Sequence, residues 1–395
     1  MSLAIINGAV FDGHSADLIE ATVRIADGVV VGVGDEPAAP GDEVIDARGG
    51  TIVPGLIDAH FHAYAVELDL LAIEASPLSF VALKGARRLE AALLRGFTTV
   101  RDVAGGDAGL ARAIETGEIR APRYLYTGAA LSQTGGHGDA RPPGIELCGC
   151  GAHLSEVVDG VDALRRAARE RFRGGAHAIK LMTSGGVVSP SDPIRNPQYS
   201  AEEIAAVTDE AARRGSYVAA HAYSPEAIAH SVSNGVRSIE HGNLLDRPAA
   251  ELMARHGAYL VPTLAAYDAL NLRGAELGLA AVSQAKNVEV LDAGREAIGV
   301  ARAAGVPVGW GSDLMGALED HQLQGLRLQA EVDGPLELLR SVTSVNAELL
   351  GREDLGRIAV GARGDVVILA GNPLEDPSPL WAPGGRIVVQ GGRRV

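Results

Sequence analysis

The sequence has few cysteines and no long apolar run, and both absences narrow the class of protein. The two cysteines, Cys148 and Cys150, form a C-x-C pair near His153, but no fourth metal ligand lies close to them. We therefore interpret them as two reduced loop thiols, which is typical of a reducing compartment. The longest apolar stretches, such as AYLVPTLAAY, are much shorter than the roughly 20 residues that span a bilayer.

The sequence also contains no long basic cluster, and we expect no secretory leader. The formal net charge is −15, and no long run of lysine or arginine interrupts the acidic composition. This balance argues against nucleic acid or an anionic membrane as the main partner. The first residues, MSLAIINGAV, lack a basic segment followed by an extended apolar one. We expect a soluble, cytoplasmic protein that acts on a small molecule.

The composition is that of a globular protein, with 47% hydrophobic and 22% charged residues in a chain of 395. This length favours a large domain accompanied by a smaller one. Both chain ends contain short strand patterns separated by Gly and Asp-Gly turns. We predict one small β-sandwich domain formed by residues 1–54 and 355–395, with residues 55–354 inserted as a second domain.

The middle of the chain alternates apolar strand patterns with Ala/Arg/Glu-rich helical patterns such as VDALRRAARERFRGG. The expected strands cover residues 51–60, 98–104, 123–128, 178–183, 217–222, 238–242, 258–264 and 306–313. Eight strand–helix units over this length are typical of an α/β fold of the (β/α)₈, TIM-like barrel type. A doubly wound open sheet is the alternative, but no Gly-rich nucleotide loop follows the first strand.

Polar residues lie at or near the carboxyl ends of several expected strands, where barrel enzymes place their catalytic groups. They are His60, His62, Lys180, His221, His241 and Asp313. His60 and His62 are two positions apart and therefore face the same side of a strand. Taken singly, such residues are commonly hydrogen-bonded core histidines, paired lysines or helix-capping aspartates. Their coincidence at converging strand ends favours a shared site.

The residue types in this set suit metal ions. Imidazoles and a carboxylate bind Zn²⁺ or a similar divalent ion, and four histidines with one aspartate favour two ions over one. Lys180 cannot bind a cation as an ammonium. A lysine buried in an apolar strand has a lowered pKa and more neutral amine, which can react with CO₂ to form an anionic carbamate that bridges two metals.

The remaining histidines divide into one candidate and several others. His137 lies in the Gly-rich loop LSQTGGHGD, on the same face of the expected barrel, where it could reach a substrate carbonyl or belong to an ordinary flexible loop. His321 follows Asp313 by eight residues and could approach the site, but we do not include it. The others are interpreted as surface or structural residues: His14, His153, His177, His230 and His256.

With these residues in place, the chain resembles the amidohydrolase superfamily over nearly its whole length. The motifs VPGLIDAHFH, IKLMTSGG, AAHAYSPEAI, SIEHGN and GSDLMG stand in the order of that superfamily. The lysine in a barrel strand resembles the binuclear members rather than the mononuclear deaminases and imidazolonepropionase-like members. LSQTGGHGD, HAYSPEAI and VPTLAAYDAL are similar to the dipeptidase and carboxypeptidase branch that includes Xaa-Pro and Xaa-Arg/Lys dipeptidases.

The resemblance implies a metal-dependent hydrolase that cleaves the amide bond of a dipeptide or small peptide-like substrate, as a prolidase does. It assigns His60, His62 and Asp313 to one metal ion. It assigns His221 and His241 to the other, with carboxylated Lys180 and a hydroxide bridging the two. The resemblance implies that the ions are zinc.

The same resemblance implies further roles. Asp313 would act as the catalytic acid and base, His137 would polarise or orient the scissile carbonyl, and Tyr223 would contact the substrate. It also implies a homo-oligomer.

Two other classes of function stay open. One is a hydrolase that uses the same site on N-acyl amino acids, aryl amides, carbamates or cyclic amides. The other is a non-enzymatic scaffold of the same fold, which the complete ligand set disfavours. A sugar- or phosphate-binding barrel lacks support because no phosphate-cradling glycine loop follows the seventh and eighth expected strands.

Overall fold

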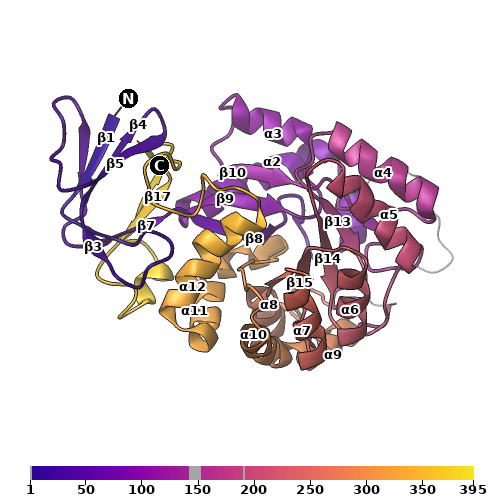
Figure 1. Cartoon of the computed structure of the whole chain (residues 1–395). Helices are drawn as coiled ribbons and strands as arrows, with labels where there is room; N and C mark the ends of the chain where they lie inside the picture. Colours follow the sequence, from indigo (N-terminus) through magenta and orange to yellow (C-terminus); the bar gives the residue numbers. More distant parts are fainter. Residues whose placement is uncertain (1, 142–152, 190–191) are drawn as a thin grey trace.

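The computed structural model describes residues 2–141, 153–189 and 192–395, so Cys148 and Cys150 lie outside the described residues. Figure 1 shows two parts. Strands from both chain ends form the part on the left, and a larger α/β part extends to the right with helices around a group of strands. Both termini lie in the left-hand part.

The terminal part contains two sheets. The first has the order β5-β4-β1-β6, and its strands are Val29–Gly34, Thr22–Ala26, Ser2–Ile6 and Glu43–Asp46. The second has the order β19-β18-β17-β7-β2-β3, with strands Arg393–Arg394, Ile387–Gln390, Val366–Leu369, Thr51–Pro54, Ala9–Val10 and Ile19–Glu20. Asp27 and Gly28 turn the chain between β4 and β5 with φ angles of 50° and 80°, as a tight Asp-Gly hairpin requires.

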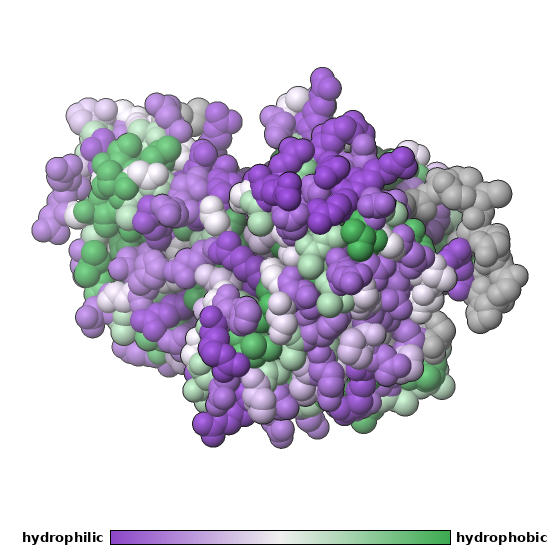
Figure 2. All heavy atoms as spheres, turned by 45° about the vertical axis from the view of Figure 1, so that its right-hand side comes forward, coloured by the Kyte–Doolittle hydropathy of each residue, from purple (hydrophilic) through white to green (hydrophobic). Residues whose placement is uncertain are grey.

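One apolar cluster joins the two terminal sheets. Leu3 and Ile25 of the first sheet contact this cluster together with Ile52, Val366 and Val389 of the second. Because β7 pairs with β17 across the chain ends, removal of water from these side chains holds the N-terminal and C-terminal segments together. Figure 2 shows a hydrophobic patch on the outer surface over this part of the molecule.

The α/β part contains two sheets of parallel strands. The three-stranded sheet has the order β10-β9-β8, with strands Arg123–Tyr126, Phe97–Asp102 and Leu56–Phe61. The six-stranded sheet has the order β12-β11-β13-β14-β15-β16, with strands Ser155–Val157, Ala130–Ser132, Ile179–Met182, Val218–Ala222, Ser238–His241 and Tyr259–Val261. Because the ladder is divided between two sheets, closure into an eight-stranded barrel stays a prediction, as do the sandwich and the domain boundaries.

The helices mostly follow the strands and cover their outer faces (Figure 1). They are α1 Leu70–Ala75, α2 Leu78–Leu94, α3 Ala108–Glu115, α4 Val161–Arg173, α5 Ala201–Ala212, α6 Pro225–Ser233, α7 Arg247–Arg255, α8 Leu264–Arg273, α9 Ala281–Leu291, α10 Ala293–Ala303, α11 Gln322–Asp333, α12 Pro335–Arg340 and α13 Asn346–Leu349. Short turns of other helix types cover Gly316–His321, Ser341–Val345 and Ser378–Leu380. Within the described ranges, every helix is too short or too polar to cross a membrane.

Strand alternation decides which side chains face the helices. Ile179 and Leu181 of β13 pack in an apolar cluster with Ile204 and Val207 of α5. Lys180 lies between them in the strand and therefore points to the opposite face, away from the helices. The same alternation operates on β14, where Val218 and Ala220 belong to this cluster.

The segment 51–60, predicted as one strand, forms two strands in different sheets. β7 pairs with β17, whereas β8 pairs with β9, and Gly55 lies between them. A Cβ atom at Gly55 would lie 2.0 Å from Thr98 Oγ1, so only glycine permits this close approach. Pro54 additionally has no N–H to continue a ladder.

The predicted strand at 306–313 is not a regular strand. Val308 forms an isolated parallel bridge with Leu260, and Trp310 O accepts a hydrogen bond from Ala59 N at 3.1 Å. Asn346 Nδ2 donates hydrogen bonds to Ile57 O and to Trp310 O, both at 2.8 Å. The Asn346 side chain therefore links this segment to β8 where a regular strand would use backbone hydrogen bonds.

Candidate active site

One pocket at the carboxyl ends of the parallel strands is lined by all eight residues predicted for the site. They are His60, His62, His137, Lys180, His221, Tyr223, His241 and Asp313. The empty space in the pocket is about 850 Å³, open solvent at its mouth included. Residues that are far apart in the chain therefore face a common cavity.

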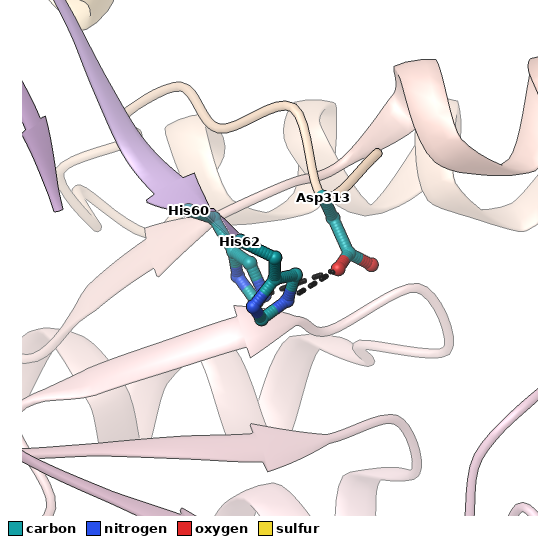
Figure 3. Close-up of side chains that lie close together, drawn as sticks. All are labelled: His60, His62 and Asp313. Atoms are coloured by element: carbon teal, nitrogen blue, oxygen red, sulfur yellow. Dashed lines mark hydrogen bonds and ion pairs between the residues drawn. The ribbon is translucent and has the colours of Figure 1, made fainter. Parts of the chain in front are cut away.

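His60, His62 and Asp313 form the tightest group in this pocket. Figure 3 shows both imidazoles, at the end of β8, pointing toward the carboxylate of Asp313. Asp313 Oδ1 lies 2.9 Å from His62 Nε2 and 3.3 Å from His60 Nε2. One potential ligand atom from each residue lies within 4.8 Å of the other two, a spacing that one ion could bridge. Phe61 packs in an apolar cluster instead.

His221 and His241 extend this group toward β14 and β15. Their ring centroids are 4.5 Å apart, and the His241 ring lies 4.9 Å from that of His60. His241 and Asp313 both have left-handed backbone conformations, with φ of 72° and 53°. For residues other than glycine such conformations cost about 1–3 kcal/mol, so the surrounding structure holds the site in a strained arrangement.

The ring nitrogens of His60 and His62 have oxygen neighbours on both sides. His60 Nδ1 donates to Glu240 Oε2 at 2.7 Å, and its Nε2 lies 3.3 Å from Asp313 Oδ1. His62 Nδ1 lies 3.4 Å from Ala104 O, and its Nε2 lies 2.9 Å from Asp313 Oδ1. Both Nε2 atoms therefore face the Asp313 carboxylate, and an ion held there would take the Nε2 lone pairs while Nδ1 keeps the proton.

The other two histidines are held in a similar way. His221 Nε2 donates to Gly185 O at 3.1 Å, which leaves Nδ1 free. His241 Nδ1 lies 2.8 Å from Thr263 Oγ1, which leaves Nε2 free. Burial lowers the pKa of His221 and of His241 well below the usual range, so both rings are neutral and suited to bind a cation.

Lys180 and Asp313 are the two remaining ionisable groups of the predicted metal site. The Lys180 side chain is buried, and its Nζ has no hydrogen-bond partner among the described residues. Burial lowers the pKa of Lys180 to about 8. Burial alone would raise the pKa of Asp313, but His60 and His62 lower it well below its usual range, which keeps the carboxylate ionised. The free imidazole nitrogens, this carboxylate and an unpartnered amine fit divalent metal ions.

Comparison with known proteins agrees with this donor set. The model of the amidohydrolase family matches residues 51–391 of the chain. The chain belongs to the amidohydrolase family. It is a hydrolytic enzyme of a family whose members bind divalent metal ions.

Three relatives illustrate the range within this family. The crystal structure of a prolidase complexed with N-methylphosphonate-L-proline is 46% identical and covers 100% of this chain and 99% of its own, with a TM-score of 0.97. A Xaa-Pro dipeptidase with methionine bound in its active site is 28% identical over 100% of both chains, with a TM-score of 0.88. The ochratoxinase of Aspergillus niger is 34% identical over 406 residues, which cover 95% of this chain and 82% of that protein.

This amidohydrolase contains a buried ion pair behind His60 that the sequence analysis missed. Glu240 Oε1 accepts from Arg101 Nη2 at 2.8 Å, and both side chains are fully buried. Burial would raise the pKa of Glu240, but Arg101 and His60 lower it below its usual range. A charged residue inside an apolar strand was the signal that identified Lys180, and the same signal is present in TTVRDVA and SIEHG.

His137 lies in the loop after β11, and its ring stacks on that of His221 with centroids 4.2 Å apart. Its Nδ1 lies 2.7 Å from Ser189 Oγ, and the Ser189 hydroxyl in turn donates to Asp192. The carboxylate can only accept, so Ser189 accepts from His137 Nδ1 and Nε2 is the nitrogen left for a substrate. Ser189 and Asp192 were not identified from the sequence, because a Ser and an Asp in a loop have many ordinary roles.

Tyr223 and His321 have different surroundings. Tyr223 lines the pocket and stacks on His241 with ring centroids 5.1 Å apart, but its hydroxyl lies 2.8 Å from that of Tyr267. Tyr267, from α8, was also missed by the sequence analysis. His321 Nδ1 lies 3.0 Å from Asp320 Oδ1, and His321 is not among the described residues that line the pocket.

Proposed function

We propose that this protein hydrolyses the amide bond of a dipeptide or small peptide-like substrate, as a Xaa-Pro dipeptidase does, with two divalent metal ions. The observation that carries the proposal is the convergence on a single pocket of four imidazoles, one ionised carboxylate and one buried lysine that has no hydrogen-bond partner among the described residues. The similarity to a prolidase complexed with N-methylphosphonate-L-proline supports this reaction class.

The proposed metal ligands form two sets. His60, His62 and Asp313 would hold one ion, and His221 and His241 the other. Two ions, zinc in our proposal, would supply a hydroxide nucleophile at neutral pH and polarise the scissile carbonyl. The neutral amine of Lys180 could react with CO₂, with release of one proton, to give a carbamate that would help to hold the ions. Its lack of a hydrogen-bond partner among the described residues and its lowered pKa support that reaction.

In the proposed reaction, protein side chains would transfer the protons and stabilise the negative charge that develops on the carbonyl oxygen. Asp313 would accept the proton of the attacking nucleophile and deliver it to the leaving nitrogen. His137 Nε2 would face the scissile carbonyl and orient it. Burial lowers the pKa of His137, so the ring would stabilise the oxyanion as a positively charged group only after it takes up a proton. Asp192 Oδ2, 3.8 Å from His137 Nδ1, would balance that charge.

A second substrate class is favoured by the apolar wall of the pocket. Apolar side chains also line the pocket: Leu68, Leu70, Met182, Val187, Leu270, Met315 and Leu318. Such a lining suits a bulky apolar acyl group or side chain. N-acyl amino acids are therefore the second candidate, and the similarity to ochratoxinase supports it.

The architecture that we infer for this function is the closed (β/α)₈ barrel with a terminal β-sandwich. Segment 307–310 supports closure because it bonds to strands on both sides. Leu260 N of β16 donates to Pro307 O at 3.0 Å, and Ala59 N of β8 donates to Trp310 O at 3.1 Å.

The experiment combines metal analysis with a substrate panel. Purified protein should contain about two divalent ions per chain, and chelation should abolish hydrolysis until metal is restored. The panel contains Xaa-Pro dipeptides, Xaa-Arg dipeptides and N-acyl amino acids with apolar side chains. Full activity of metal-free protein would overturn the mechanism, and an absence of both metal and hydrolysis would favour the scaffold alternative.

A further inference from the structure

A chain of hydroxyl groups runs from His241 to Tyr223 along one wall of the pocket. His241 Nδ1 lies 2.8 Å from both Thr263 Oγ1 and the Tyr267 hydroxyl. Thr263 Oγ1 donates to the Tyr267 hydroxyl at 3.2 Å, and the Tyr267 hydroxyl lies 2.8 Å from that of Tyr223. All four side chains are buried, and the rings of both tyrosines and His241 line the pocket.

The direction of these hydrogen bonds depends on the state of His241. A neutral imidazole carries one proton, so a ring that gives its Nε2 lone pair to a cation must carry the proton on Nδ1. The single Nδ1 proton is then shared between Thr263 Oγ1 and the Tyr267 hydroxyl. The Tyr267 oxygen accepts from His241 and from Thr263, which favours donation of its own proton to Tyr223.

The Tyr223 oxygen then accepts from Tyr267, and its proton is left for a group in the pocket. With the proton of His241 on Nε2 instead, the order reverses: Tyr267 donates to His241, and Tyr223 donates to Tyr267. In that state Tyr223 offers only a lone pair to the pocket. The two states of His241 therefore present opposite hydrogen-bonding character at Tyr223.

We propose that Tyr267 and Thr263 are positioning residues that make Tyr223 a hydrogen-bond donor when His241 binds a cation through Nε2, so that the substrate presents an oxygen acceptor at Tyr223. This inference rests on the proposed function for the presence of the cation. It deepens that function because an acceptor oxygen, from a carboxylate or from a carbonyl, is the substrate group that the pocket recognises at this wall. A substrate ammonium group is disfavoured there.

The test uses substitutions that remove one oxygen atom each. Tyr267→Phe and Tyr223→Phe are measured singly and together on L-leucyl-L-proline and on its C-terminal amide, in zinc-loaded protein. We expect each single variant to lose about 10-fold to 100-fold in kcat/KM, the range for a hydrogen bond to a charged group. The double variant should lose no more than the Tyr223→Phe variant, because both changes break one chain.

The two substrates distinguish the sources of the acceptor oxygen. If the acceptor is the carboxylate, only the free acid loses kcat/KM in the variants; if it is a carbonyl, both substrates lose equally. Thr263→Ser keeps the hydroxyl and should lose less kcat/KM than Tyr267→Phe. Tyr199→Phe is the matched control, since the Tyr199 hydroxyl is also buried but donates to Val158 O at 2.9 Å, away from the pocket.

Metal affinity provides a readout that needs no turnover. Tyr267→Phe removes one of the two acceptors of His241 Nδ1 and should weaken zinc binding about 10-fold in chelator competition, whereas Tyr199→Phe should not. If the wild-type protein binds zinc but hydrolyses no peptide, the proposed function is wrong. Zinc affinity then still tests the hydrogen-bonded chain from His241 to Tyr223. Additive losses in the double variant, or unchanged zinc affinity in Tyr267→Phe, would overturn the inference.

Discussion

The terminal sheets and the carboxyl ends of the parallel strands are both well buried, but their interiors have opposite chemistry. The terminal sheets enclose aliphatic side chains such as Leu3, Ile52 and Val366. The strand ends enclose charged groups such as Arg101, Glu240 and Lys180. Apolar burial stabilises a fold directly, whereas buried charges must be offset by partners and contribute little net stability.

This contrast teaches that the two regions serve different purposes. The terminal sheets hold the chain ends together, and the strand ends hold a strained, charged arrangement that the rest of the fold must support. Substitutions in the first region should therefore change stability and leave the chemistry intact. Substitutions in the second should change metal binding or turnover by more than they change folding.

The largest effect is expected for Asp313→Asn. Asparagine tolerates the left-handed backbone found at this position, but it cannot accept a proton, so turnover should fall by about 10³-fold to 10⁴-fold. The free energy of unfolding of the metal-free protein should change by no more than about 1 kcal/mol. Steady-state kinetics and urea unfolding measure the two quantities. A variant that keeps a tenth of wild-type turnover would contradict the role of Asp313.

In the terminal sheets, Ile52→Ala should lower the free energy of unfolding by about 2–5 kcal/mol, because it leaves a cavity in a closed apolar cluster. The turnover of the folded enzyme should be unchanged, since the pocket lies in the other part of the molecule. Ile19→Ala is the matched control, because Ile19 in the same sheet is 52% exposed. Its substitution should alter the free energy by less than about 0.5 kcal/mol. Loss of turnover in folded Ile52→Ala would show that the two regions are coupled.

The pH dependence of stability should reveal His177, which precedes β13 beneath the site. Burial and then the charge of Arg101 lower the pKa of His177 to about 4 from its ordinary value of 6.5. Between these values the unfolded chain binds a proton that the folded chain does not, so stability falls as the pH falls from 6.5 to 4. The contribution is at most about 3 kcal/mol.

His177→Gln should remove this part of the pH dependence, as measured by urea unfolding at a series of pH values. His14→Gln, at an exposed position, should leave the wild-type profile unchanged. Identical profiles for wild-type protein and His177→Gln would show that His177 does not titrate in this way.

The smallest effect is expected for Glu240→Gln. The substitution weakens the acceptor of His60 Nδ1 and should lower metal affinity about 10-fold to 100-fold, the range for outer-shell partners of metal ligands. Glu210→Gln is the control, because Glu210 pairs with Arg165 and Arg169 between α4 and α5, away from the pocket. Equal metal affinities in the two variants would show that Glu240 does not contribute to metal binding through His60.

Much of the site follows from residue types and strand order. A histidine pair at the end of one apolar strand, a lysine inside a second and single polar residues at the ends of three others predict a shared pocket from the sequence alone. The structure places all eight predicted residues in the lining of one pocket. Ser189 and Tyr267 were harder to predict, because their residue types have many ordinary roles, whereas Glu240 carries the same signal as Lys180, a charged residue inside an apolar strand.

The fold shows the same division. Apolar patterns located the strands near 98–104, 178–183 and 217–222, where β9, β13 and β14 lie. They did not show that Gly55 separates two strands of different sheets, since that break depends on contact with Thr98. They also did not show that segment 306–313 is held by the Asn346 amide instead of a regular ladder.

The sequence by itself determined which donor atoms this amidohydrolase can offer to metal ions, because side-chain chemistry and strand alternation are local properties. Only the tertiary structure decided which ring nitrogens have acceptor oxygens beside them and which hydroxyl groups lie in line with His241. Those choices depend on hydrogen bonds between distant segments, such as His60 with Glu240, 180 positions apart. A proton can occupy only one ring nitrogen of a neutral histidine, and the folded neighbours select which one.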